Sequence, residues 1–93
     1  MNRSDLIQRL SKLHPQLLVK DSEQAVSEII DAISATLATG GRVEIRGFGC
    51  FVINHRAPRT GRNHKTGVAV EVPAKDAPHF RAGKELRERV NPD

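Results

Sequence analysis

Apolar residues recur every three or four positions in the first part of the chain, which is the spacing of an amphipathic helix. The first stripe consists of Leu6, Ile7, Leu10 and Leu13. It predicts a helix over residues 3–13, whose first turn Asn2 or Ser4 can cap by accepting hydrogen bonds from exposed N–H groups. His14-Pro15 is expected to end it, because a residue before proline is disfavoured in the α region.

A second and longer apolar stripe follows. It consists of Val26, Ile29, Ile30, Ile33 and Leu37, with small alanines between them. Asp21 or Ser22 is expected to start this helix, with Gln24 in a capping-box arrangement three places after Asp21. Gly40-Gly41 is expected to end it, because glycine readily adopts the left-handed geometry of a C-cap. A stripe of this width fits an ordinary core, and it also fits a seam between two chains.

The apolar period changes from 3.6 to 2 at Arg42, which indicates strands. Strands are predicted over residues 42–46, 50–56 and 68–72. Gly47-Phe48-Gly49 is expected to form a tight turn or bulge between the first two, because glycine permits positive φ. The polar stretch 57–67 joins the last two as a hairpin.

Two prolines interrupt the sequence after the third predicted strand. Pro73 and Pro78 are expected to break the segment after the third strand, and a short helix is predicted from Lys84 to about Val90. The elements together predict an α+β fold. It has two N-terminal helices, a three-stranded antiparallel sheet with a long β-ribbon arm, and a short C-terminal helix.

The composition changes this picture by pointing to a partner chain. The 93 residues suffice for one domain with a small core. Only 3% of residues are aromatic, namely Phe48, Phe51 and Phe80, so a second chain is expected to complete the apolar faces. The single Cys50 excludes a disulfide framework, and no apolar run approaches the ~18–20 residues that span a membrane. The N-terminus does not resemble a signal peptide, so a soluble protein of a reducing compartment is expected.

Positive charge is concentrated in the second part of the chain. Residues 1–40 hold four Lys/Arg and five Asp/Glu, whereas residues 41–93 hold eleven Lys/Arg and six Asp/Glu. Between Glu44 and Glu71 there is no acid and there are five cations, Arg46, Arg56, Arg59, Arg62 and Lys65. This asymmetry indicates a polyanionic partner. It does not choose among DNA, RNA and an anionic membrane.

The stretch RTGRNHKTG, residues 59–67, carries the strongest functional signal. Pro58 and Pro73 flank it, and proline is confined to sheet edges, so the hairpin is an edge ribbon. Cations at every third residue alternate between the two faces of an extended ribbon, so both faces can neutralise phosphates. For each phosphate neutralised, the log of the binding constant falls by ~0.9 per unit of log salt concentration. The alternatives are a charged hairpin that only keeps the protein soluble, and a ribbon that binds RNA or protein.

Neither metal nor catalytic chemistry is indicated. The histidines, His14, His55, His64 and His79, have no metal-ligand spacing, and structural zinc needs about four ligands. Cys50 is interpreted as a small strand residue. Lys65-Thr66-Gly67 matches a β-lactamase element, but the chain lacks Ser-x-x-Lys, and it has no Walker motif. We expect no enzyme activity, no cofactor, no metal and no small-molecule substrate.

Residues 41–67, GRVEIRGFGCFVINHRAPRTGRNHKTG, and the later run PHF with GKELRER resemble the bacterial HU and integration host factor family. Within that family the chain is more similar to the beta-type chains of integration host factor than to HU. The resemblance implies an intertwined dimer built from one domain. Residues 1–40 would form the helical dimerisation body, 41–82 the sheet and arm with its tip at about 57–67, and 83–91 the C-terminal helix.

The resemblance also implies which side chains meet DNA. These are Arg42, Glu44, Arg46, Arg56, Arg59, Arg62, Asn63, His64, Lys65, Arg81 and Lys84, with Arg3 and Lys75 as weaker candidates. Glu44 would orient the neighbouring arginines, and Lys84 would meet phosphate at a helix start. The family places a proline wedge in the motif R-N-P-K-T-G, where this chain has His64. Either His64 stacks between bases in place of the proline, or it does not insert and the partner's arm bends the DNA alone.

The resemblance implies a cytoplasmic, nucleoid-associated protein that bends double-stranded DNA through the minor groove. Its partner would be an alpha-type chain of the same family, and the pair would act in recombination, in transcription and translation regulation and in nucleoid organisation. The alternative is an HU-like homodimer that binds DNA with little sequence preference. No membrane partner is expected.

Overall fold

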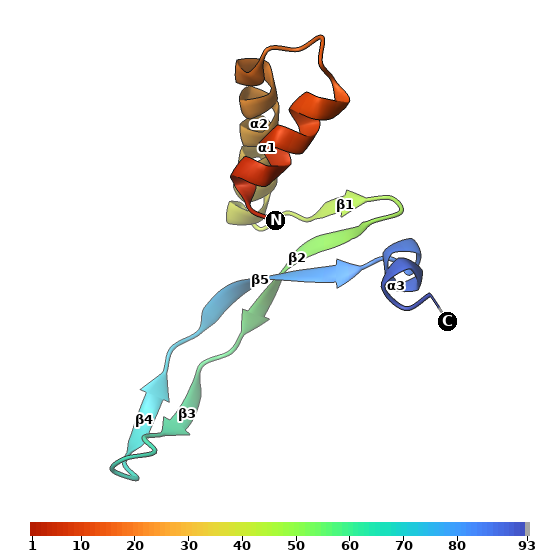
Figure 1. The fold of residues 1–93 in the computed structure, drawn as a ribbon. Coiled ribbons are helices and arrows are strands. Elements are labelled where there is room, and N and C mark those ends of the chain that lie inside the picture. The colour runs from red at the N-terminus through yellow and green to blue at the C-terminus, as the bar shows by residue number, and fades with distance from the viewer. Residues whose placement is uncertain (93) are drawn as a thin grey trace.

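The computed structural model describes residues 1–92 of the chain. Two helices, α1 (Arg3–Leu13) and α2 (Val19–Ala38), form one part of the molecule, and a sheet with a projecting arm forms the other (Figure 1). The strands are β1 (Val43–Ile45), β2 (Gly49–Arg56), β3 (Arg59–Arg62), β4 (Ala69–Val72) and β5 (Lys75–Ala82). Helix α3 (Lys84–Val90) follows β5. The predicted α+β fold class is confirmed.

Helix α1 begins and ends where the sequence predicts. The Asn2 side chain accepts a hydrogen bond from the Asp5 N–H at 2.9 Å, and the Asp5 carboxylate accepts one from the Asn2 N–H at 3.0 Å. This reciprocal capping box satisfies two N–H groups that have no partner inside the helix. Of the two predicted caps, Asn2 is therefore the one used. His14 is the C-cap residue, as predicted.

Helix α2 begins earlier than predicted. Its first residue is Val19, with Leu18 at the N-cap, so the predicted start at Asp21 or Ser22 is wrong. Asp21 lies inside the first turn, where its carboxylate accepts a hydrogen bond from the Leu18 N–H at 3.3 Å. The carboxylate thus stabilises the helix start from the third helical position and not from the cap itself.

The end of α2 is a glycine C-cap, as predicted. Gly40 has φ of 82°, in the left-handed region that favours glycine. Its N–H donates to the Leu37 carbonyl, and the Gly41 N–H donates to the Thr36 carbonyl at 2.9 Å. This pair of bonds is the Schellman arrangement. It turns the chain directly into the sheet.

Strands β1, β2 and β5 form an antiparallel sheet in that order. β5 pairs with β2 along its whole length, from Gly49 opposite Ala82 to Arg56 opposite Lys75. The predicted break at Pro73 is confirmed, because that residue lies between β4 and β5, whereas the predicted break at Pro78 is wrong, because Pro78 lies inside β5, opposite Ile53. An edge strand tolerates proline, since the N–H that proline lacks can face away from the ladder.

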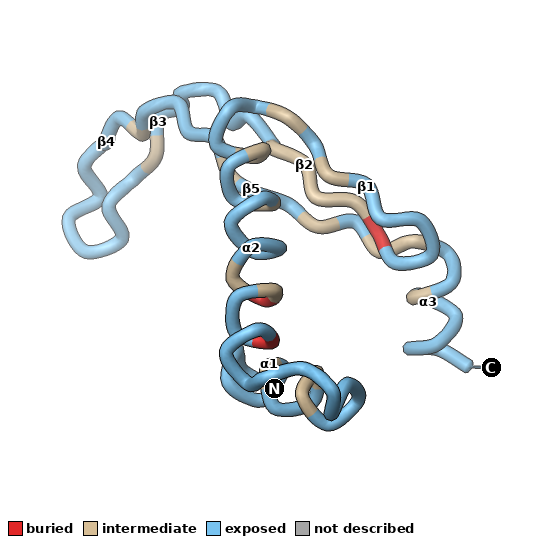
Figure 2. The backbone as a smooth tube through the Cα atoms, turned by 90° about the horizontal axis from the view of Figure 1, so that it is seen from above, coloured by how far each residue is buried: buried red, intermediate tan, exposed pale blue. Residues whose placement is uncertain are grey.

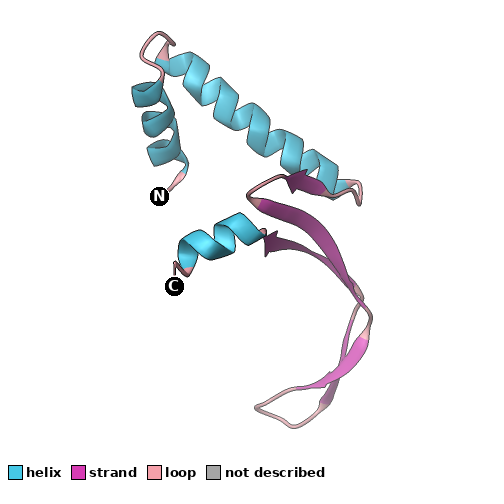
Figure 3. Ribbon diagram, turned by 90° about the vertical axis from the view of Figure 1, so that its right-hand side faces the viewer, coloured by secondary structure: helices cyan, strands magenta, loops and turns pink. Residues whose placement is uncertain are grey.

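The predicted hairpin of strands 50–56 and 68–72 is also corrected. β2 pairs with β5, and β4 pairs instead with β3, with Arg59 opposite Val72. The two ladders keep one register, which places Pro58 opposite Pro73 at the gap between them. Pairing lapses there because neither proline can donate a ladder hydrogen bond. Beyond this gap the ribbon bends toward the side on which α3 lies, and its tip lies far from α1 and α2 (Figure 3).

Few side chains are buried in the chain alone. Among residues 1–92, Val26 is the one hydrophobic side chain classed as buried, and the backbone is mostly exposed (Figure 2). The Cα radius of gyration is 19.1 Å, whereas a compact domain of this length has about 12 Å. The accessible surface is 8017 Å², against about 5,400 Å² for a compact monomer of this mass. Much apolar surface is thus left for another chain to cover.

The one aromatic cluster lies on the sheet. The ring centroid of Phe80 is 4.9 Å from that of Phe51 and 5.2 Å from that of Phe48. Phe51 and Phe80 are direct neighbours across the β2–β5 ladder. Gly49 is buried beside them, because the Arg81 carbonyl and the Phe80 ring occupy the space that a side chain would need.

We expect Gly49→Ala to lower the free energy of unfolding by about 1–3 kcal/mol, through overpacking of the sheet. A Cβ at this position would lie 2.5 Å from both the Arg81 carbonyl oxygen and the Phe80 ring. Urea unfolding measures the loss. Gly61→Ala is the control, because the nearest atom to its Cβ would be in the Val72 side chain, at 3.3 Å. Equal losses in the two variants would contradict the packing argument.

Candidate nucleic-acid interface

The sheet has two chemically different faces. Directly paired residues point to the same side of a sheet, and successive residues alternate. The register therefore assigns one set, here called the core face, to the side of the aromatic cluster: Val43, Ile45, Phe51, Ile53, His55, Asp76, Pro78 and Phe80. The opposite set, here called the basic face, is Glu44, Cys50, Val52, Asn54, Arg56, Lys75, Ala77, His79 and Arg81.

Arg42 and Arg46 flank the basic face at its β1 end. The Arg42 guanidinium lies 3.4 Å from the Glu44 carboxylate. Arg46 lies in the turn after β1 and lines a hollow of about 600 Å³ together with Glu44, Cys50 and Arg81. Of the predicted pairings of Glu44, the one with Arg42 is therefore present. Within residues 1–92 no Glu44–Arg46 ion pair is found.

Three glycines, with Ile45 and Ala82, form the rest of this hollow. Gly47, Gly49 and Gly83 line it beside Arg46 and Arg81. Gly47 has φ of 83°, and the Phe48 N–H donates to the Ile45 carbonyl at 3.0 Å, which closes the tight turn that the sequence predicts. The hollow thus brings Arg46 and Arg81 together with Glu44 and three glycines.

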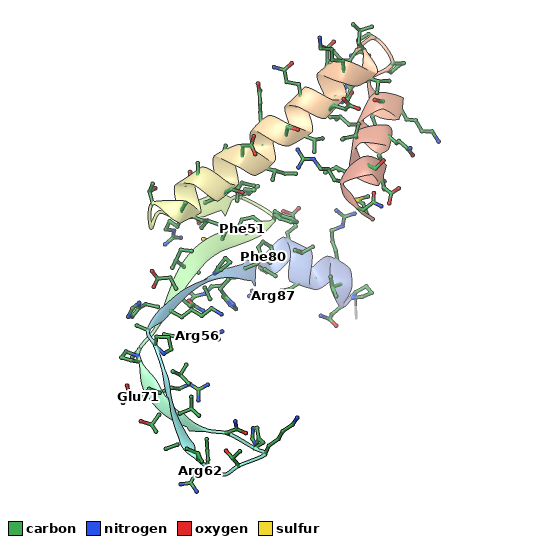
Figure 4. All side chains as sticks on the ribbon, turned by 90° about the vertical axis from the view of Figure 1, so that its left-hand side faces the viewer. Phe51, Arg56, Arg62, Glu71, Phe80 and Arg87 are labelled. Atoms are coloured by element: carbon green, nitrogen blue, oxygen red, sulfur yellow. The ribbon has the colours of Figure 1, made fainter. Side chains whose placement is uncertain are left out.

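The arm also presents two faces. The β3–β4 register assigns Arg59, Gly61, Val70 and Val72 to one face, and Thr60, Arg62, Ala69 and Glu71 to the other. Arg59 and Arg62 therefore lie on opposite faces, as the three-residue spacing predicts. Glu71 lies on the convex side of the curved arm (Figure 4). The arm face with Arg59, Val70 and Val72 therefore lies on the concave side. This face has a cation and no acid.

Asn63 organises the arm tip. Its side-chain oxygen accepts hydrogen bonds from the Lys65 N–H at 2.8 Å and the Thr66 N–H at 3.4 Å. Its backbone carbonyl accepts the Gly67 N–H at 2.7 Å. An asparagine that bonds the backbone just beyond it is a common turn former. The His64 side chain is exposed at the point of this turn.

The predicted site residues fall into three groups in space. Arg42, Glu44, Arg46, Arg56 and Arg81 lie on or beside the basic face, and Arg59, Arg62, Asn63, His64 and Lys65 lie along the arm. Lys84 lies apart, at the start of α3, where its ammonium is 4.0 Å from the Glu88 carboxylate. Of the weaker candidates, Lys75 lies on the basic face. Arg3 lies on the helices, where it donates to the Ser27 hydroxyl at 2.5 Å.

His79 lies on the basic face and was missed by the sequence reasoning. Its position follows from the alternation Lys75, Ala77, His79, Arg81, which the expected break at Pro78 obscures in the sequence. His55 faces the other way, and its Nδ1 lies 2.7 Å from a carboxylate oxygen of Asp76. The two histidines are therefore separated by the sheet.

Within residues 1–92 the structure shows neither a cluster of metal ligands nor a membrane-spanning helix. No group of three or more His, Cys, Asp or Glu side chains there could hold a metal ion. No helix in that range is both long and apolar enough to cross a membrane. The candidate interface is thus the basic face together with the arm. It is a polar, cationic surface and not an enclosed cleft.

The family model described as bacterial DNA-binding protein matches residues 1–91. The chain belongs to this bacterial DNA-binding family. It is 58% identical over 91 residues to the integration host factor subunit beta of Laribacter hongkongensis (strain HLHK9), covering 98% of this chain and 92% of that one. It is 59% identical to the corresponding subunit of Tolumonas auensis, covering 98% of each chain. The resemblance seen in the sequence is confirmed.

Solved structures of the bacterial DNA-binding family agree with this assignment. The chain is similar to Anabaena HU in a cocrystal with DNA, with a TM-score of 0.88, 32% identity and full coverage of both chains. It is also similar to a point mutant of HU from Thermotoga maritima, with a TM-score of 0.70, 28% identity and coverage of 97% of this chain and 99% of that one.

We expect Asn63→Ala to loosen the arm tip, because it removes the oxygen that accepts the Lys65 and Thr66 N–H groups. Hydrogen exchange at these two amides should accelerate several-fold, since exposed amides exchange once local bonds open. Amide exchange by NMR measures it. His64→Ala serves as the control, because the His64 side chain accepts neither bond. Unchanged exchange in Asn63→Ala would show that the tip is held by other contacts.

Proposed function

We propose that this chain is the beta-type subunit of a dimeric architectural protein that bends double-stranded DNA through its minor groove. The observation that carries the proposal is the gathering of Arg81, Arg56 and Lys75 on one face of the β2–β5 ladder, which leads directly into an arm that carries Arg59, Arg62 and Lys65. A curved ribbon of this kind can follow a groove and neutralise phosphates on both sides of it. One acid, Glu44, lies on the basic face, and Arg42 partly neutralises it.

A second chain completes the proposed protein. The surface in excess of a compact monomer is about 2,600 Å² per chain, or about 5,200 Å² for two chains, which reaches the upper part of the range that obligate dimers bury in total. Exposed apolar side chains mark where a partner packs, among them Ile29 on α2, which is 61% exposed, and Phe48 beside the sheet. The relatives named as integration host factor subunit beta support an alpha-type chain of the same family as the partner. In this proposal residues 1–40 form the dimerisation body, 41–82 form the sheet and the arm that meets DNA, and Lys84 at the start of 83–91 adds a DNA contact.

The bend would come from two contributions. Cations on the basic face draw the flanking duplex onto the protein, and the arm tip opens a base step in the minor groove. Unstacking costs a few kcal/mol per step, and the additional contacts made by bent DNA offset that cost. Arg59 with Val70 and Val72 on one arm face suits a groove that is narrow, anionic and partly apolar. Glu71, on the other arm face, is kept away from the DNA.

His64 occupies the position at which other family members have the proline wedge. Two mechanisms could apply to this histidine. A planar imidazole can stack on an exposed base, as aromatic side chains do. Alternatively it stays in the groove, and the partner's arm supplies the kink. The backbone N–H of His64 donates to none of the hydrogen bonds described for the tip. A proline at this position would therefore leave the turn intact.

A second candidate function is an HU-like homodimer that binds DNA with little sequence preference. The similarity to Anabaena HU in complex with DNA favours it. Arg42, Glu44 and Arg46 favour the first candidate, because they bring two arginines and a carboxylate to the edge of the basic face, where they can read minor-groove shape. Both candidates imply a cytoplasmic, nucleoid-associated protein without enzyme activity, which acts in recombination, transcription and nucleoid organisation.

The proposal is tested by DNA bending, measured as fluorescence transfer between the ends of a duplex a few helical turns long. We expect the wild-type chain, assembled with an alpha-type partner, to bend the duplex, and His64→Pro to bend it at least as sharply. Equal bending would assign the wedge to the imidazole. Deeper bending with proline would mean that this tip does not insert. No bending by either protein would overturn the proposed function.

We expect Arg46→Ala to weaken binding to a selected preferred duplex by about 1–3 kcal/mol and to relax its sequence preference. Binding to random DNA should fall less, since that binding depends on phosphates. Fluorescence anisotropy at fixed salt measures both affinities. Arg9→Ala is the matched control, because it removes the same charge from an exposed position on α1. Equal losses on preferred and random DNA would remove Arg46 from any role in discrimination.

A further inference from the structure

The basic face holds a titratable side chain that the proposed function does not use. His79 is exposed on β5, opposite Val52 of β2. Its neighbours on the same strand face are Ala77 and Arg81, one step away on either side. Because Arg81 lines the hollow with Arg46, His79 lies between that cationic hollow and the start of the arm.

The surroundings of His79 leave the imidazole available. β5 is an edge strand, so β2 is its one neighbour in the sheet. The charged or titratable groups on this face are Lys75 and Arg81 from β5, Cys50 and Arg56 from β2, and Glu44 of β1 with its partner Arg42. Within residues 1–92, no hydrogen bond or ion pair involves the His79 side chain, and the one acid on this face is engaged by Arg42.

His55 provides a built-in comparison. It lies on the core face, where its Nδ1 is 2.7 Å from the Asp76 carboxylate. Its charge, when protonated, is therefore met by an acid of the same protein, and DNA on the basic face would lie on the other side of the sheet. His14, at the end of α1, and His64, at the arm tip, are likewise off the basic face.

We propose that His79 binds a DNA phosphate in its protonated form, so that DNA binding by this face takes up a proton. The inference rests on the proposed function, and it adds a regulation of the same surface. Histidine is the side chain whose charge changes in the physiological pH range. A phosphate stabilises the imidazolium and not the neutral ring, so by linkage the affinity for DNA rises as pH falls. At higher pH the neutral ring contributes no charge, and the arginines hold the duplex alone.

The proposal predicts a measurable change in the salt dependence of DNA binding. One more phosphate neutralised steepens the slope of log K against log salt by ~0.9. The wild-type slope should therefore steepen by that amount between about pH 8 and pH 5.5. Over the same range the affinity should rise about three- to tenfold, as expected for one charge-assisted contact at a wet surface.

The test uses the assembled dimer with its partner chain unchanged, a random-sequence duplex, and fluorescence anisotropy across this pH range. His79→Gln keeps a polar side chain that cannot become charged, and in a His64→Gln background, which removes the arm-tip imidazole, we expect it to lose the pH-dependent part of the affinity and the change in slope. His79→Lys carries a permanent charge, and we expect it to bind at every pH about as tightly as wild type does at low pH. His55→Gln, the matched control from the other face, should keep the wild-type pH dependence.

Each outcome decides the question. If His79→Gln retains the full pH dependence, or if wild type shows none, the proposal is overturned. If His55→Gln abolishes the dependence while His79→Gln does not, the core-face pair and not the phosphate contact is responsible. Thermal unfolding of every variant across the pH range separates loss of fold from loss of contact. Failure of all variants and wild type to bind DNA at high pH, where arginines alone suffice, would instead reject the proposed function.

Discussion

Strands β2 and β5 are paired along their whole length, and the position of every functional side chain depends on this ladder. Gly49 lies opposite Ala82 at one end, and Arg56 lies opposite Lys75 at the other. The same register continues past the two prolines into the arm. A shift of β5 by one residue would turn its side chains to the opposite face of the sheet and move its cations among the phenylalanines. Phe51 and Phe80, packed 4.9 Å apart between ring centroids, oppose such a shift.

The ladder divides the sheet into one face for folding and one for recognition. Aromatic and aliphatic side chains collect on the core face, toward surfaces that a second chain can cover. Arginine and lysine collect on the basic face, where no packing partner competes with an anion for them. The exposed Arg42–Glu44 pair contributes little to stability, because surface ion pairs gain about 0–1 kcal/mol. The pair instead orients the Arg42 guanidinium beside the hollow that Arg46 and Arg81 line.

An extended chain of this size cannot be stable through its own core. With a radius of gyration of 19.1 Å and Val26 as the one buried hydrophobic side chain of residues 1–92, it depends on association. Coupling of folding to dimerisation has a functional consequence. The two basic faces and two arms of a dimer would be placed relative to each other by the same apolar contacts that fold the chain, so the curvature imposed on DNA would be a property of the interface.

The sequence by itself determined the helices, the turns and the charge asymmetry, because these depend on local signals: 3.6-residue periodicity, the Asn2 cap, and the left-handed glycines Gly40 and Gly47. It also determined the family, through the long run from Arg42 to Gly67. Only the tertiary structure decided that residues 75–82 form the partner of β2. That pairing is a contact between distant segments, and Pro78, a local breaker, is compatible with it solely because β5 is an edge. The ladder in turn placed His79 among the cations and His55 beside Asp76, since the face to which a side chain points follows from register.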